Sequence, residues 1–362
     1  MFEAILKFFT SLRVTVVCLL CLIVLIFFGT LYQVDHGIWQ SQQHFFYSWL
    51  VTWKSIPVFP GGQLVLGVLF VNLLAAMLFR MHLSWRSLGI SLVHIGLLLM
   101  LAGGWFTHSF AEDSFLTLAE GEGSNVTMSA RDWELSLWKD RKSPLNIVAV
   151  DTGSFKQGVG IDFDEVSCRV EVDAYYPNSE VTGLGETGLK ALKRDNDPQR
   201  DVPGAVVRVI QGETTQHIVL HGSTVMPSVV GEGDDAVFIT LRRKRYPMPI
   251  QVTLHDFQKE YHPGSTIAAA FSSAIEVDVQ GVKRPVLIEM NEPFRFKEYT
   301  FYQASFGNLG DSELSTFSVT QNYGRLIPYV ATALTVIGLI LHFVVDLRMR
   351  SRMSRRSREA VV

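Results

Sequence analysis

Four apolar segments constrain the fold of this chain more than any other feature of its sequence. They cover residues 14–33, 62–79, 87–106 and 326–345. Each is close to the ~20 residues that an α-helix needs to cross about 30 Å of hydrocarbon. We therefore predict four transmembrane helices. The first segment is too long for a signal peptide and no small-residue cleavage site follows it, so we expect it to be retained.

Basic residues predict how these helices are oriented. The loop between the first two helices holds only one base, Lys54, and residues 347–362 form a basic tail. Cytoplasmic loops carry an excess of Lys and Arg, so both termini are expected in the cytoplasm and residues 107–325 on the opposite face. The bases behind this prediction are Lys7, Arg13, Arg80, His82, Arg86 and the arginines at 348, 350, 352, 355, 356 and 358. Tryptophans at 39, 49, 53, 85 and 105 lie near the predicted helix ends, as in an aromatic belt.

Residues 107–325 have the pattern of β structure. About ten short segments, such as SCRVEVDAYY and PIQVTLHDF, alternate apolar and polar residues or are rich in β-branched and aromatic residues. Without helices between the strands, the pattern favours one or two barrels or sandwiches. The polar stretch 181–204 is expected to be a long loop or an insertion between two lobes. The predicted fold is a polytopic α-helical membrane protein with an all-β extracytoplasmic domain between helices three and four. Its domains are 1–106, 107–325, 326–346 and the tail 347–362.

Composition and motifs exclude several functions. The formal net charge is only -3, so no charged partner is favoured and we expect no nucleic acid ligand. Three cysteines are too few for a disulfide framework, and no Cys-x-x-Cys-His haem-attachment motif occurs. Residues 107–325 show no Ser/His/Asp set, phosphate-binding loop or Cys/His metal pattern. We therefore predict no catalytic residue.

One histidine, His94, lies inside the third apolar segment, SLVHIGLLLMLAGG. Ser84, Ser87 and Ser91 precede it at helical spacing, and Leu98, Leu101, Trp105 and His108 continue the same predicted helix face. Three interpretations stay open. His94 could pack against a neighbouring helix, for example against Asn72, could relay protons, or could be an axial ligand of a haem or metal. A proton relay would need carboxylates in the helices, and there are none.

The whole chain resembles the ResB/CcsB family of System II cytochrome c biogenesis. The resemblance is carried by the start, LKFFTSLRVTVVCLLCLIVLIFFGTLYQ, and by SLVHIGLLLMLAGGWF with its histidine. It continues in LTLAEGEG and FQKEYHPGSTIAAAFSSAIEVDV. The most specific segment is MNEPFRFKEYTFYQASFG, which includes Asn291, Pro293, Tyr302, Gln303 and Ser305. The order of these segments matches as well.

The resemblance implies a function in the bacterial inner membrane. It implies a complex with a CcsA/ResC-type partner that exports haem b and supports its attachment to apocytochrome c, together with thiol-reducing proteins. His94 would be one axial haem ligand, with Ser91 and Asn72 as candidates to support its imidazole. The tryptophan-rich haem-handling segment of fused relatives is absent. The chain would therefore be one subunit of a holocytochrome c synthase rather than a complete enzyme. The alternative is a scaffold that binds no haem and whose β domain binds apocytochrome or thiol-reducing partners.

Overall fold

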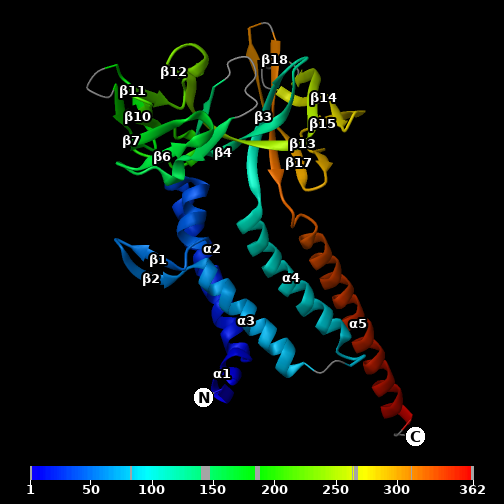
Figure 1. The fold of residues 1–362 in the computed structure, drawn as a ribbon. Coiled ribbons are helices and arrows are strands. Elements are labelled where there is room, and N and C mark those ends of the chain that lie inside the picture. Colours follow the sequence, from blue (N-terminus) through cyan, green and yellow to red (C-terminus); the bar gives the residue numbers. More distant parts are fainter. Residues whose placement is uncertain are drawn as a thin grey trace. The chain divides into compact units, whose positions relative to one another are not determined.

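The chain forms two compact units, Met1–Ala111 with Asn322–Val362, and Glu112–Gln321. The structure is a computed structural model that describes residues 2–81, 84–139, 147–183, 188–262, 264, 268–310 and 312–359. We call the unit Met1–Ala111 with Asn322–Val362 the helical unit and the unit Glu112–Gln321 the β unit (Figure 1). His82, one of the bases in the predicted turn, lies outside the described residues.

Within the described residues, four helices are long and apolar enough to cross a membrane. They are Leu12–Phe46, Gly62–Arg80, Leu88–Phe110 and Ile327–Arg348. The elements of the helical unit are α1 (Phe2–Phe9), α2 (Leu12–Ser41), η1 (Gln42–Phe46), β1 (Leu50–Trp53), β2 (Ile56–Pro60), α3 (Gly62–Arg80), α4 (Leu88–Phe110) and α5 (Ile327–Glu359). The predicted domain boundaries differ in detail. Position 106 lies inside α4, and α5 continues through the basic tail to Glu359.

Helix α2 turns back on itself after the first apolar segment, residues 14–33. Gly37, with φ 77° and ψ 163°, interrupts the helical backbone. The chain then returns beside α2, where the hydroxyl of Ser41 donates to the carbonyl of Gly29 at 2.6 Å. A Cβ built on Gly29 would lie 3.0 Å from the ring of Phe46 in η1, so a larger residue here would require this ring to shift by a few tenths of an ångström. The cysteines Cys18 and Cys21 are free and pack in the apolar cluster of α2 and α3.

Helices α4 and α5 pack with their backbones almost in contact. Gly89, Gly96 and Gly103 recur every seven residues on one face of α4. A Cβ built on Gly96 would lie 2.7 Å from the carbonyl oxygen of Ala331 in α5, and one built on Gly89 would lie 2.5 Å from the backbone nitrogen of His342. Small residues permit such close approach between membrane helices. Side chains larger than hydrogen on this face would therefore push the two helices apart.

The β unit is built from antiparallel strands. A ten-stranded sheet has the order β15-β14-β13-β4-β3-β18-β17-β16, with β12 added to β13 and β5 added to β4. A four-stranded sheet has the order β11-β10-β7-β6, and β8 pairs with β9. The strands are β3 (Glu112–Ala119), β4 (Gly123–Trp138), β5 (Val148–Asp151), β6 (Gly160–Phe163), β7 (Cys168–Tyr176), β8 (Ser179–Val181), β9 (Leu189–Ala191), β10 (Gly204–Gln211), β11 (Thr214–His221), β12 (Ser228–Val230), β13 (Val237–Tyr261), β14 (Ala268–Val279), β15 (Val282–Glu289), β16 (Phe294–Phe296), β17 (Tyr299–Leu309) and β18 (Ser312–Gln321).

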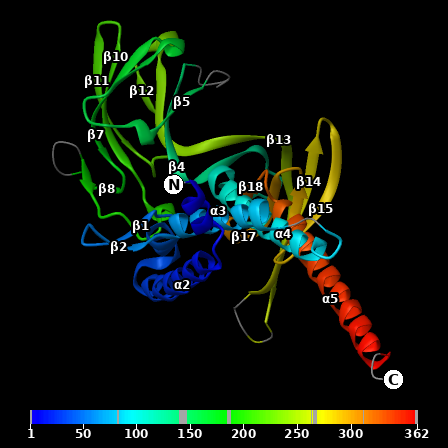
Figure 2. The same ribbon diagram turned by 90° about the horizontal axis from the view of Figure 1, so that it is seen from below.

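Two hydrophobic cores divide the β unit into two lobes that share the long strands β4 and β13 (Figure 2). In the first lobe, the four-stranded sheet packs on the C-terminal half of β4 and the N-terminal half of β13, with Val170, Val207 and Ile239 fully buried. In the second lobe, β3, β14, β17 and β18 enclose a core around Leu254 and Phe317. We expected one or two barrels or sandwiches. The structure has one sandwich-like lobe and one lobe formed by the rest of the large sheet.

Irregular pairing of β4 and β13 marks the boundary between the lobes. The register between them shifts after Arg243 and again after Pro247. In β4, the hydroxyl of Ser129 accepts the backbone N–H groups of Arg131 and Asp132 at 3.3 and 3.0 Å. These contacts satisfy backbone groups that lose their strand partners at the irregularity.

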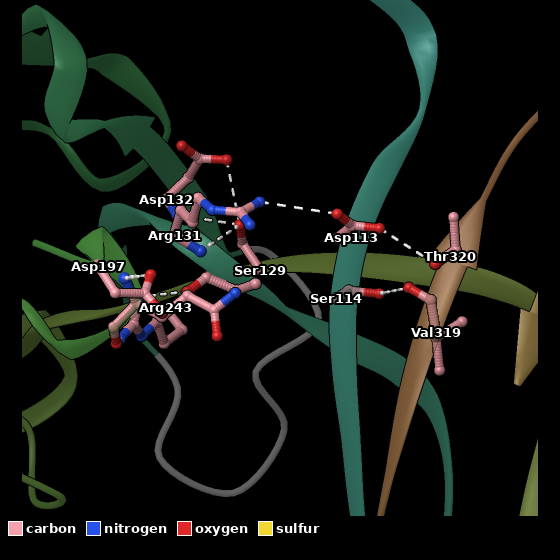
Figure 3. Close-up of polar contacts among 11 residues, drawn as sticks. Asp113, Ser114, Ser129, Arg131, Asp132, Asp197, Arg243, Val319 and Thr320 are labelled. Atoms are coloured by element: carbon pink, nitrogen blue, oxygen red, sulfur yellow. Dashed lines mark hydrogen bonds and ion pairs between the residues drawn. The ribbon is translucent and has the colours of Figure 1, made fainter. Parts of the chain in front are cut away.

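Arg243 lies at this boundary between the lobes, which we call the junction (Figure 3). Its guanidinium donates to the carbonyls of Ala130 and Gln199 at 2.9 and 2.6 Å and lies 4.2 Å from the ring centre of Trp133. Burial lowers the pKa of this guanidinium, with Asp132 opposing the shift. Beside the junction, Asp113 of β3 pairs with Arg131 at 3.7 Å and accepts the hydroxyl of Thr320.

The stretch 181–204 is not an insertion between the lobes, so that part of the prediction is wrong. It connects β7 to β10, which are neighbours in the four-stranded sheet. Its described part holds the β9 side of the β8–β9 hairpin and a short 3-10 helix, Pro198–Arg200. The carbonyl of Gln199 in this short helix accepts Arg243, so the stretch is tied to the junction of the lobes.

We expect Gly96→Leu to disrupt the α4–α5 pair. The new side chain would collide with the α5 backbone, and overpacking of this kind costs about 1–3 kcal/mol or more. The melting temperature of the purified protein in detergent should fall. Gly104→Leu is the matched control, because a Cβ at Gly104 meets nothing within 4 Å. Equal melting temperatures for the two variants would contradict the close packing.

Candidate functional site

His94 lies on the face of α4 that is opposite to its contact with α5. At about 100° per residue, its position is roughly 160–180° around the helix from Gly96 and Gly103. The glycine face is covered by α5. His94 itself is half-buried. The packing of the two helices therefore turns this imidazole away from α5.

The hydrogen bond of His94 selects its tautomer. Nδ1 lies 2.8 Å from the backbone carbonyl oxygen of Ile90, one turn earlier in α4. A carbonyl oxygen only accepts, so Nδ1 carries the proton and Nε2 keeps its lone pair. Within the described residues no hydrogen bond to Nε2 is present. Metal-bound histidines commonly donate their other N–H to a carbonyl in this way, so Nε2 could coordinate a metal.

The predicted polar stripe through His94 is only partly helical. Helix α4 begins at Leu88, and Ser84 and Ser87 lie before it with their hydroxyls 3.1 Å apart. These two serines therefore do not extend the helix face, because they form the turn that starts the helix. Farther along, Leu98 is buried but the side chain of Trp105 is 65% exposed. The middle of the stripe is thus buried, and its end at Trp105 is exposed.

Ser91 and Asn72, the predicted supports of His94, have other partners. The hydroxyl of Ser91 donates to the carbonyl of Ser87 at 3.0 Å. The Asn72 amide nitrogen donates to the carbonyls of Phe9 and Ser11 at 2.6 and 3.1 Å. Its oxygen accepts the hydroxyl of Thr15 at 2.6 Å. Asn72 thus joins α3 to the break between α1 and α2, which agrees with its predicted interhelical bonding, while Ile90 takes the place predicted for a supporting side chain.

Further histidines gather in stacked pairs that the sequence did not indicate. His36 and His44 both stack on the ring of Tyr32, with centroids 3.8 and 5.3 Å away. His108 stacks on Tyr47 at 3.8 Å. The reversal of the chain at Gly37 brings His44 back to Tyr32, so that break in the helix was the available signal. Among the described residues, however, no group of three His, Cys, Asp or Glu side chains is placed to hold a metal ion. His94 therefore belongs to no such group among these residues.

Cys168 is a buried thiol of the first lobe. Desolvation raises its pKa to about 11, with Lys139 opposing the shift. Thiol exchange needs the thiolate, and neither the burial nor the environment of Cys168 favours it. The single buried thiol is therefore a packing group and does not provide redox chemistry.

These features define a class of protein: four apolar helices, one of which carries a half-buried histidine, and a two-lobed β unit inserted between the last two helices. Comparison with protein families adds to this description. Residues 203–316, from the start of β10 into β18, match the model of the ResB-like family. This match confirms the resemblance to ResB/CcsB proteins. A search of curated proteins finds no matching relative.

Asn72→Leu is expected to destabilise the helical unit. It removes the amide bonded to the carbonyls of Phe9 and Ser11, and buried polar groups left without partners cost about 1–3 kcal/mol. The melting temperature in detergent should fall, whereas Asn322→Leu should lower it less, because it removes only a 3.4 Å bond to Thr107 and one local bond from the N–H of Gly324. An unchanged melting temperature for Asn72→Leu would contradict this stabilising role of Asn72.

Cys168 is expected to resist alkylation in the folded protein. At pH 8 a thiol with a pKa of about 11 is ~0.1% ionised, roughly a hundredfold less than one with a pKa of 9.0. In a variant with Cys18 and Cys21 replaced by Ala, maleimide labelling followed by mass spectrometry should be slow at pH 8. Its rate should rise as the pH approaches 11, and denaturant should make it fast. Rapid labelling of the folded protein at pH 8 would contradict the assignment.

Proposed function

We propose that this protein is a haem-binding membrane subunit of c-type cytochrome biogenesis, in which Nε2 of His94 is one axial ligand of a transported haem. The ResB-like match supports participation in cytochrome c biogenesis. The observation that carries the ligand assignment is the bond from Nδ1 of His94 to the carbonyl of Ile90, which leaves Nε2 as the coordinating atom. Haem is the cargo here and not a resident cofactor.

The second ligand comes from another chain in this proposal. A bis-histidine site needs two imidazoles, and the contacts of the described residues bring no second histidine to His94, whose Nδ1 is bonded to the carbonyl of Ile90. A CcsA/ResC-type partner would cover the half-buried face that carries His94 and complete the site. The exposed side chain of Trp105 on the same face supports such a contact.

The orientation follows from charge. With Lys7, Arg13 and Arg80 on the cytoplasmic side, the β unit lies outside the cytoplasmic membrane, in the periplasm. His94 is the seventh residue of α4, about 10 Å from the start of the helix at 1.5 Å per residue. It would therefore meet haem in the cytoplasmic half of the membrane. The β unit would meet apocytochrome c, and with it any thiol-reducing protein, on the outer side.

The test is the visible absorption spectrum of the purified complex, co-expressed with a CcsA/ResC-type partner. We expect a Soret band of b-type haem that falls on the order of tenfold or more in His94→Ala at equal protein concentration. Added imidazole should restore the band. His342→Ala is the control, since His342 is a histidine of α5 and should leave haem content unchanged. Asn72→Leu should lower stability without removing the band from the protein that remains folded.

Two outcomes would overturn this proposal. A full Soret band in His94→Ala would exclude the ligand assignment. A wild-type complex that binds apocytochrome but carries no haem would favour the alternative, a scaffold whose β unit recruits its partners.

A further inference from the structure

The hairpin between α2 and α3 exposes many apolar side chains. Its strands β1 and β2 meet in a two-residue turn, Lys54 and Ser55, whose positive φ values of 48° and 67° match the twist of a tight hairpin. Trp53 and Ile56, on either side of the turn, are 68% and 65% exposed. Trp49, Leu50 and Val58 are exposed as well. So much exposed apolar surface on a small hairpin marks an interaction site.

Backbone contacts fix the base of the hairpin. The N–H of Gly61 donates to the carbonyl of Trp49 at 2.9 Å. A Cβ on Gly61 would lie 2.7 Å from the carbonyl carbon of Ser48, and one on Gly62 would lie 2.7 Å from the carbonyl oxygen of Phe46. Val51 is buried in the cluster of α2 and α3. The hairpin therefore cannot swing freely, and Figure 1 shows it projecting sideways from these helices.

The length of α3 sets the depth of the hairpin in a membrane. Helix α3 has 19 residues. At 1.5 Å per residue it is about 28 Å long, barely the thickness of the hydrocarbon layer. Its last residue, Arg80, would lie at one boundary, so its first residue, Gly62, must lie at the other. The hairpin is joined to Gly62 and lies at that same boundary.

We propose that residues 49–60 form an interfacial anchor that inserts its apolar side chains among the lipids at the outer headgroup–acyl boundary. The proposal rests on the membrane insertion contained in the proposed function. Open sheet edges are excluded from the hydrocarbon core but can be hydrated at the boundary, where tryptophan is enriched. Val51 and Phe59 pack against α2 and α3, whereas Trp53 and Ile56 beside the turn are exposed and Lys54 is the only charge in the segment. Lipid can surround this exposed apolar end while the ammonium of Lys54 reaches the headgroups.

Depth-dependent quenching of tryptophan fluorescence tests the anchor. The full-length protein is reconstituted in bilayers that contain lipids brominated either near the headgroup or near the chain end. Trp49 and Trp53 are isolated by subtracting the spectrum of the double variant Trp49→Phe with Trp53→Phe. We expect their emission to be quenched by at least about twofold more with bromine near the headgroup. Trp138→Phe, in the β unit, is the matched control and should leave the amount of quenched emission unchanged.

The outcomes separate this inference from the function it rests on. If the protein stays in carbonate-washed vesicles but neither lipid quenches Trp49 and Trp53, the hairpin lies in water or against protein, and the anchor is refuted. Stronger quenching by bromine at the chain end would also refute it, because the hairpin would then lie in the hydrocarbon core. If carbonate extracts the protein, membrane insertion itself fails, and the proposed function fails with it.

Discussion

The close backbone contact between α4 and α5 determines where the other surfaces of the helical unit point. Gly89, Gly96 and Gly103 give α4 only one face on which another backbone can approach. Rotating α4 would place side chains against α5, so the orientation of the helix about its own axis is fixed. His94 is turned away from α5 for that reason. At the far ends of this pair the chain enters and leaves the β unit through β3 and β18, whose residues Glu112 and Gln321 are paired in register.

The sequence predicts those parts of the helical unit that depend on local hydropathy. An apolar segment of about 20 residues has few alternatives to a helix, so all four were found. What it does not predict are the places where the backbone departs from that rule. Gly37 interrupts α2 beyond the first apolar segment, and Ser84 and Ser87 form a turn although their spacing fits a helix face. In both cases the deciding interactions, Ser41 with Gly29 and Ser84 with Ser87, are hydrogen bonds that periodicity does not report.

The β unit shows the same division between local and distant information. Alternation of apolar and polar residues predicts strands, since each strand buries one face. The division into lobes depends instead on Arg243 meeting Ala130 and Gln199, which lie far away in the chain. The stretch 181–204 could not be assigned from its polar composition for this reason. Its 3-10 helix supplies a carbonyl to the guanidinium, a function that only the folded arrangement reveals.

The environment of His94 depends on both local and distant contacts. Its ligand chemistry is local, because the carbonyl of Ile90 one turn earlier fixes the tautomer and no side chain from another helix is required. The predicted supports fail because Asn72 is committed to the α1–α2 break and Ser91 to its own helix. In the proposed function, one chain would therefore present one ligand, half of a bis-histidine site. In the proposed function this division has a physical advantage. Each imidazole supplies only part of the free energy that binds haem. Separating the two chains would therefore weaken haem binding and allow haem to be released.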